Sequence, residues 1–330
     1  MRLAGAAWLL ALVASAGGTG DAIGDAAQGG APAPAAPPPA LTSLWRDTPA
    51  DTSRVRIDAI PEIIEPSDLL LRGGSLYTVS DSVNKVYRLV LDGSRGRILK
   101  VESWKPVGLP SVTDLEAMTS LPGGEVLLAN ETTGSLFVLK PFPDHACAVW
   151  QSGVAGTCLI GRPNCGIEAL AALPGGRLFV GREREPRAAY LFDLPEHPCE
   201  AGTLRHRVAL KLPKEVGSDI SAATYDAATG HLLLVGRSSQ RVVEVELAPD
   251  AHHAPDARGD ARPPELRLLG VFSFATTENA LDYAGLDFHQ VEGIAVDEQR
   301  VLYLAVDSNG RLSRSLGGGR AALLRFFPVE

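Results

Sequence analysis

Three carboxylates and two hydroxyls recur along this chain at intervals of about 50 residues, and they are the first candidates for chemistry. Glu116, Glu168 and Glu292 occupy three of the five positions, and Ser67 and Ser221 occupy the other two. Each position stands just before an apolar run. Carboxylate oxygens are the preferred ligands of hard cations such as Ca²⁺. If the five positions are structurally equivalent, the glutamates meet at one place.

The elements that would bring them together are short strands joined by Gly-rich turns. The five openings read EPSDLLLRGGSLYTVSD, DLEAMTSLPGGEVLLANE, GIEALAALPGGRLFVGRE, SDISAATYDAATGHLLLVGR and QVEGIAVDEQRVLYLAVD. A third strand follows each opening, and a fourth follows in the first four units. The segment Val55 to Ile60 precedes the first unit and would supply the missing strand of the last. The pattern predicts an all-β, five-bladed β-propeller of four-stranded antiparallel blades, closed by its N-terminal strand.

The N-terminal end predicts export. Residues 1–16 carry one Arg, an apolar run and an Ala-Ser-Ala, which is the layout of a signal peptide. Residues 17–52 are rich in Ala, Gly and Pro and predict a disordered tether, and residues 53–330 form the propeller domain. The expected location is periplasmic, secreted or peripheral to the cell envelope, with no transmembrane span in the mature chain.

The net charge limits the kinds of partner that can bind, and the cysteines limit the possible disulfide bonds. The formal net charge of −8 repels phosphate backbones, so nucleic acid is excluded as a partner, and a monomer is expected. The four cysteines lie close together in the sequence and allow three disulfide pairings if the protein is exported. We predict Cys147 with Cys158 and Cys165 with Cys199.

In a propeller the start of each first strand faces one mouth of the central channel, so Glu116, Glu168 and Glu292 would share a ring. Two ionised carboxylates about 5 Å apart repel by about 3 kcal/mol at an effective dielectric near 20. A proton, a basic side chain or a cation can relieve this. The alternatives are a calcium site, with help from Glu65, Asp114, Asp219 and Gln290; ion pairs to Arg182, Arg184 and Arg237; or carboxylates that face solvent away from the axis.

A second set of polar residues marks the ends of the second strands. These candidate ligand-binding residues are Asp81, Asn130, Glu131, Arg182, Glu183, Arg237 and Asp307. Their mixed charges would suit a small polar or anionic ligand, or a protein partner, although strand ends also reach solvent in the absence of any ligand. His289 precedes the last opening and is a candidate general base.

The openings of the third, fourth and fifth units resemble the SdiA-regulated (YjiK-like) family of exported bacterial propellers. The likeness runs from about Arg54 to Phe327, and similar openings occur in phytase-like and lactonase-type propellers. The resemblance implies a propeller, an extracytoplasmic or membrane-associated setting and a bound metal, but no established reaction. Ala117 and Ala169 stand where related chains have Gly, and Arg237 stands where they have a polar residue or His.

Two functions fit these patterns. The first is a non-catalytic propeller that binds a small ligand or a partner at the channel mouth, with or without a central calcium ion. The second is a metal-dependent hydrolase of phosphoesters or lactones. The sequence contains no GxSxG, HExxH, P-loop or GxGxxG motif, so serine hydrolase, zincin and nucleotide-binding activities have no support.

Overall fold

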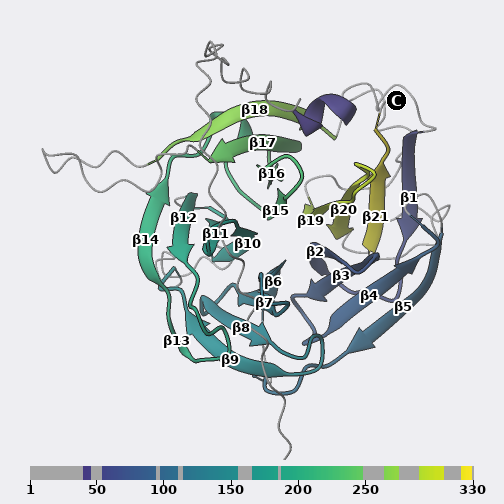
Figure 1. Ribbon diagram of the computed structural model, residues 1–330. Helices are drawn as coiled ribbons and strands as arrows, with labels where there is room; N and C mark the ends of the chain where they lie inside the picture. The colour runs from purple at the N-terminus through teal and green to yellow at the C-terminus, as the bar shows by residue number, and fades with distance from the viewer. Residues whose placement is uncertain are drawn as a thin grey trace, which may run out of the picture. The chain divides into compact units, whose positions relative to one another are not determined.

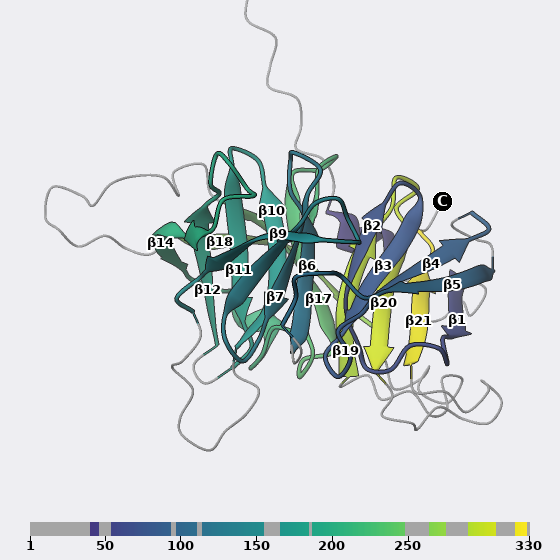
Figure 2. The ribbon, with the colours of Figure 1, turned by 90° about the horizontal axis from the view of Figure 1, so that it is seen from below.

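The predicted propeller is confirmed by a computed structural model, which describes residues 40–45, 54–93, 97–110, 114–154, 166–184, 187–247, 264–274, 290–307 and 321–328. Five antiparallel sheets surround a central axis (Figure 1), and their strands run between the two faces of the ring (Figure 2). The innermost strands are β2, β6, β10, β15 and β19. The predicted signal peptide and most of the tether lie outside the described residues.

Each blade is built on four antiparallel strands in chain order, except that β13 leaves the third blade for the edge of the second and that the last blade takes a strand from the N-terminal side. The first blade is β2 (Pro66–Arg72), β3 (Ser75–Ser80), β4 (Val86–Leu91) and β5 (Ile98–Trp104). The second is β6 (Leu115–Ser120), β7 (Val126–Asn130), β8 (Ser135–Leu139) and β9 (Ala146–Gln151), with β13 (Gly202–Thr203) added at its edge. The third is β10 (Ile167–Leu173), β11 (Arg177–Arg182), β12 (Ala188–Asp193) and β14 (Arg205–Leu210). The fourth is β15 (Ala222–Asp226), β16 (His231–Gly236), β17 (Arg241–Leu247) and β18 (Leu266–Ser273).

The fifth blade confirms the predicted closure. Its strands are β19 (Val291–Val296), β20 (Leu302–Asp307), β21 (Ala321–Phe326) and, from the N-terminal side, β1 (Val55–Ala59). β1 pairs antiparallel with β21 from Val55 opposite Phe326 to Ala59 opposite Ala322. An ion pair between Asp58 and the buried Arg325 reinforces the same two strands. The pairing gives the outer edge of β21 a partner strand.

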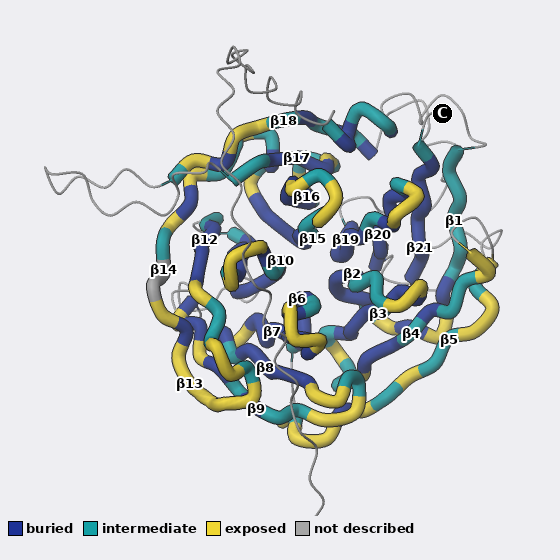
Figure 3. Tube along the Cα trace, in the orientation of Figure 1, coloured by how far each residue is buried: buried dark blue, intermediate teal, exposed yellow. Residues whose placement is uncertain are grey.

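The core is divided into five layers, one between each pair of neighbouring blades. Alternate residues of a strand face opposite sides, so Ala169 packs toward the fourth blade and Leu170 toward the second. The second strands β7, β16 and β20 are buried at every residue, whereas the outer strands β5 and β18 carry exposed residues (Figure 3). Two short 3-10 helices, η1 (Leu41–Trp45) and η4 (Lys214–Val216), are the helices among the described residues. Neither is long and apolar enough to cross a membrane.

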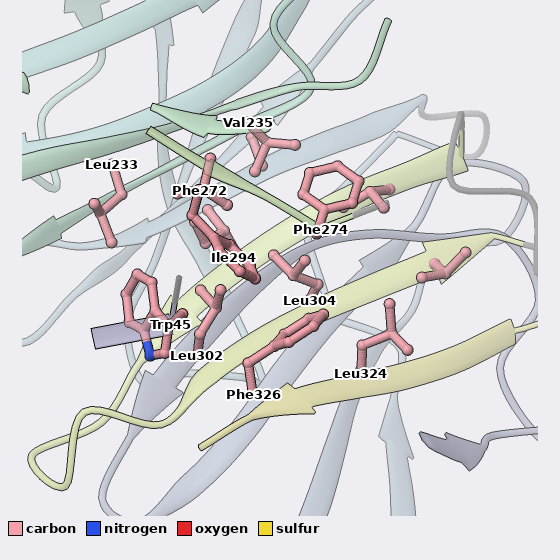
Figure 4. Packing of buried hydrophobic residues seen from close by; sticks show 14 of the residues in the cluster. Trp45, Leu233, Val235, Phe272, Phe274, Ile294, Leu302, Leu304, Leu324 and Phe326 are labelled. Atoms are coloured by element: carbon pink, nitrogen blue, oxygen red, sulfur yellow. The ribbon is translucent and has the colours of Figure 1, made fainter. Parts of the chain in front are cut away.

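The predicted tether is wrong at its C-terminal end, because η1 is packed on the ring. Trp45 is fully buried beside Phe272, with ring centroids 5.9 Å apart, in the layer between the fourth and fifth blades (Figure 4). The buried carboxylate of Glu244 accepts the backbone N–H groups of Leu41 and Thr42, both at 2.8 Å. The first N–H groups of a helix have no acceptor within the helix and need one elsewhere. The composition of this segment does not show that Glu244 is that acceptor.

The predicted cysteine pairing is also wrong, because Cys147 is bonded to Cys199. The segment that follows β12 crosses to the second blade, where β13 pairs in parallel with β9. The indole N–H of Trp150 donates to the carbonyls of Pro198 and Glu200 and holds this segment beside Cys147. Cys158 and Cys165 lie outside the described residues.

Replacing Glu244 with Ala should strongly destabilise the ring, because two N–H groups and the Thr42 hydroxyl lose their acceptor. We expect a loss of about 3 kcal/mol in the free energy of unfolding, measured in urea. The matched control is Glu246→Ala on the same strand. Glu246 is partly exposed and pairs with the exposed Arg267, so its loss should cost less than about 1 kcal/mol. Equal losses for the two variants would contradict the assigned role of Glu244.

Candidate functional site

The three predicted glutamates are the unpaired residues of β-bulges at the start of their strands. In β6, Leu115 pairs with Asn130 and Ala117 with Ala129, so that Glu116 has no partner opposite. The same break surrounds Glu168 in β10 and Glu292 in β19. A bulge re-aims the side chain of its extra residue. All three side chains are buried, with 8%, 4% and 8% of their surface exposed.

Two of the three glutamates lie together with carboxylates from the strand ends. Oxygens of Asp114, Glu116 and Glu131 lie within 4.8 Å of one another, and so do oxygens of Glu131, Glu168 and Glu183. Glu131 belongs to both groups and joins them. These five carboxylates, from the second and third blades, are called the acidic mouth below. Glu131 and Glu183 came from the second predicted set, so members of both predicted sets lie together here.

Glu292 takes a different role, because Arg237 reaches it from the fourth blade. The Arg237 guanidinium is bonded to both Glu292 and Glu183, and its Nε lies 3.8 Å from an oxygen of Asp219. Arg184 also pairs with Glu183. Burial lowers the pKa of Arg237, but the nearby carboxylates, led by Glu292, outweigh it and leave a net rise. Of the ring glutamates expected to pair with arginine, Glu292 does so, and the pairs at Glu183 were not predicted.

Glu168 has no such relief. Its carboxylate accepts no hydrogen bond and forms no ion pair with any residue that the structure describes, although it is almost fully buried. Burial raises its pKa well above the usual range, and the negative charges of Glu116, Glu183, Glu292 and Glu131 raise it further. Buried charges are normally paired or bound to a metal. Glu168 is therefore a buried acid of the site with no hydrogen-bond donor among the described residues.

Glu116 and Glu131 are each held by a neighbour. Burial raises the pKa of Glu116 well above its usual value, and the Ser67 hydroxyl partly opposes this by hydrogen bonding. Glu131 accepts the backbone N–H of Gly166 at 3.0 Å. A side chain at position 166 would collide with the Glu131 carbonyl, so this close approach requires glycine. The pKa of Glu131 is about 7, chiefly because of burial.

Further acids connect the fifth, first and second blades. The pKa of Asp81 rises to about 8 because of burial, a hydrogen bond and charge repulsion from Glu65, and the charges of Asp114 and Asp307. Asp307 is buried at the end of β20. The predicted residue Asp81 is thus repelled by both Asp114 and Asp307.

The remaining predicted residues contribute less directly. The Asn130 side chain accepts the N–H of Thr133 at 2.8 Å and its hydroxyl at 2.7 Å, which stabilises a local turn. Arg182 is buried at the end of β11. His289 lies outside the described residues.

Sequence reasoning missed Asp68, which is fully buried in β2 next to Ser67. It lies in a bulge of its own, at a backbone φ of 57°. The one available signal was an acidic residue directly before the apolar run of the first unit.

The donor set fits a hard cation. All five groups of the acidic mouth offer oxygen, with no thiolate or imidazole among them. Calcium binds oxygens at about 2.3–2.6 Å, so two oxygens on opposite sides of one ion lie about 5 Å apart. The 4.8 Å limit within each group is compatible with that span.

The raised pKa values predict that acid stabilises the protein in a chelator. Folded Asp81, Glu131 and Glu292 have pKa values of about 8, 7 and 7, above their unfolded values, so the folded state binds more protons near neutrality. This stability is complete below the unfolded pKa values and disappears as the pH rises through about 7 to 8. Urea unfolding in EDTA should therefore give a larger free energy of unfolding at about pH 5.5 than at about pH 8. A larger value at about pH 8 would contradict the assigned burial.

Several solved structures are similar to this chain at low sequence identity. Glutaminyl cyclase from Myxococcus xanthus is 15% identical, with a TM-score of 0.49, over 83% of this chain and 96% of the cyclase. A luciferin-regenerating enzyme is 13% identical, with a TM-score of 0.41, over 83% and 95% of the two chains. The WD40 repeats of RRP9 give 9% and 0.42, over 84% and 98%. These distant likenesses carry no argument about activity.

The sequence profile of the SdiA-regulated family matches residues 71–255, more than half of the chain. The matched region contains Glu116, Glu131, Glu168 and Glu183 together with the strands that position them. The fold predicted from the family resemblance is also the fold found. This chain belongs to the SdiA-regulated family.

Proposed function

We propose that this protein is an exported propeller that binds a calcium ion at the acidic mouth and binds a small ligand or a protein partner there. The observation that carries the proposal is Glu168, a buried carboxylate with acidic neighbours and no hydrogen-bond donor among the described residues. A cation held by Glu168, Glu131 and Glu183, or by Glu131, Glu116 and Asp114, would supply the missing positive charge.

Ion pairs with arginine do not offset the negative charge of every carboxylate in the acidic mouth. Arg237 and Arg184 both form ion pairs with Glu183, and Arg237 also forms one with Glu292. Glu116, Glu131 and Glu168 have no ion pair with a described residue. Repulsion of about 3 kcal/mol between two ionised carboxylates about 5 Å apart is large against an ordinary folding stability of about 5–15 kcal/mol. A divalent cation or a proton removes this repulsion, and the raised pKa values mean that protons compete with the cation up to about pH 7 to 8.

Arg184 supports a ligand with an anionic group. Its side chain is 43% exposed beside Glu183, and its Nε has no hydrogen-bond partner. A carboxylate or phosphate that met both the ion and this guanidinium would gain two electrostatic contacts. The same anion alone would be repelled by the acidic mouth.

The Cys147–Cys199 disulfide supports export, because such bonds persist in oxidising compartments. The predicted signal peptide points the same way. A periplasmic, secreted or envelope-associated location is therefore part of the proposal.

Glu168→Gln tests the calcium site. Gln keeps the size of the side chain but cannot ionise, so the metal-free variant should melt at a higher temperature than the wild type at a pH at which Glu168 is ionised. Its calcium affinity should fall at least about tenfold. Calorimetric titration and thermal unfolding after chelation measure the two effects.

The control for this variant is Glu125→Gln, a buried glutamate at the other end of β7 that pairs with Lys140 at 2.8 Å. Its loss should reduce stability without changing calcium affinity. The calcium site would be rejected if the wild type bound no stoichiometric calcium, or if Glu168→Gln left both affinity and melting temperature unchanged.

A metal-dependent hydrolase is the second candidate, and one observation favours it. Glu131 and Glu292 have pKa values of about 7, raised mainly by burial, which is the range that suits general acid–base catalysis near neutral pH. Bound calcium would polarise a phosphoryl or lactone oxygen.

One panel of phosphate monoesters, sugar acids and lactones separates the two candidates on calcium-loaded protein. Binding without turnover, measured by thermal shift and product assay, is the expected result. Arg184→Ala should abolish the rise in melting temperature that the ligand causes. Arg72→Ala should retain this rise, because Arg72 donates to the Gly124 carbonyl in a hairpin turn and not to the ligand. Calcium-dependent turnover that is lost in Glu168→Gln would favour the hydrolase.

A further inference from the structure

Asp68 is a fully buried carboxylate that accepts backbone N–H groups of β2 and β6 and interacts with a third inner strand, β19. Its Oδ1 accepts the N–H of Leu69 in its own strand at 2.7 Å. Its Oδ2 accepts the N–H of Met118 in β6, also at 2.7 Å. The N–H of Ile294 in β19 makes a weaker third interaction. Asp68 has no ion pair with any described residue, so backbone amides are its partners.

The two cross-strand partners occupy matching places. Met118 follows the bulge residue Glu116 by two positions, and Ile294 follows the bulge residue Glu292 by two positions. One carboxylate is therefore attached to the strands of the second and the fifth blade, just beyond the bulges. At each bulge the register of the strand shifts by one residue.

The backbone around Asp68 reinforces the same attachment. A Cβ on Gly293 would lie 2.5 Å from the carbonyl carbon of Asp68, so β19 packs directly on this residue. On the other side, the hydroxyl of Ser67 lowers the pKa of Glu116 by hydrogen bonding. The bulge in β2 therefore contacts both neighbouring bulged strands.

We propose that Asp68 is the positioning residue of the acidic mouth, fixing β6 and β19 against β2 and so setting where Glu116 and Glu292 stand. Through β6 it places Glu116 beside Glu131. Through β19 it places Glu292, which holds Arg237, and Arg237 in turn holds Glu183. The consequence for calcium rests on the proposed function, whereas the attachment of the two strands does not.

Asp297 provides a matched comparison at the other end of β19. It is also a buried aspartate, and it accepts the N–H of Val301 at 2.9 Å and the hydroxyl of Tyr303 at 2.7 Å. Its contacts lie within the β19–β20 hairpin, away from the bulge. A carboxylate with a merely structural role should behave like Asp297.

The first experiment compares calcium affinity in Asp68→Asn and Asp297→Asn. Asn keeps the size of the side chain but replaces one acceptor oxygen with a donor that faces an N–H group. Asp68→Asn should weaken calcium binding about 10- to 100-fold, as losses of groups that orient metal ligands do. Asp297→Asn should lower the melting temperature and leave the affinity unchanged. Equal affinities in both variants would overturn the calcium part of the inference.

The second experiment needs no calcium and separates this inference from the proposed function. Hydrogen exchange in EDTA should show faster exchange in both Leu115–Ser120 and Val291–Val296 for Asp68→Asn. Asp297→Asn should affect only the β19–β20 hairpin. Unchanged exchange in either β6 or β19 of Asp68→Asn would overturn the proposal, even if the wild type binds calcium tightly.

Asp68→Ser is a second variant in case the amide prevents folding. A serine hydroxyl can still accept the N–H of Leu69 but is too short to reach Met118 or Ile294. It should give the same faster exchange in β6 and β19. Normal exchange in both strands of Asp68→Ser would contradict the assigned reach of the carboxylate.

Discussion

The backbone pairing of β1 with β21 is the constraint on which the rest of this structure depends. It joins residues from the two ends of the folded chain and brings the fifth blade against the first. Without this pairing, Asp68 would not pack against Gly293, and the charge of Asp307 would not raise the pKa of Asp81. The packing is consistent with this, because each of the five apolar layers lies between two blades and needs both. If one pair of neighbouring blades separated, the apolar layer between them would be lost and strand edges would become exposed.

Closure also concentrates negative charge. Five first strands converge on one axis, and the bulges turn three of their acidic residues toward the same opening. The repulsion is relieved unevenly, because Arg237 pairs with Glu183 and Glu292 and Arg184 pairs with Glu183, whereas Glu168 has no ion pair with a described residue. A fold that only needed stability would gain from an apolar or neutral residue at this position. The uneven relief is therefore the physical basis for proposing a ligand, and calcium is the ligand whose oxygen preference the donors match.

Repeats made the fold and part of the site predictable. The recurrence of Glu116, Glu168 and Glu292 at matching positions of like units implied a shared opening, and the apolar segment Val55 to Ile60 implied closure. Glu131 and Glu183 were predicted as ends of second strands, but their contact with Glu116 and Glu168 was not, because it depends on the bulges. Asp68 was missed since its partners are backbone amides, which leave no pattern in the side chains.

Sequence by itself determined the number of blades, the order of their strands and the types of residue at the mouth, because these follow from periodic patterns along one chain. Only the tertiary structure decided which partners those residues take. Cys147 bonds to Cys199 because a loop crosses between blades, and Leu41–Trp45 packs on the ring because Glu244 accepts its N–H groups. Glu292 forms an ion pair and Glu168 does not, because Arg237 bonds to Glu292 and attracts Glu168 only through its charge. Such choices depend on distances of a few ångströms between remote segments, which spacing along the chain does not encode.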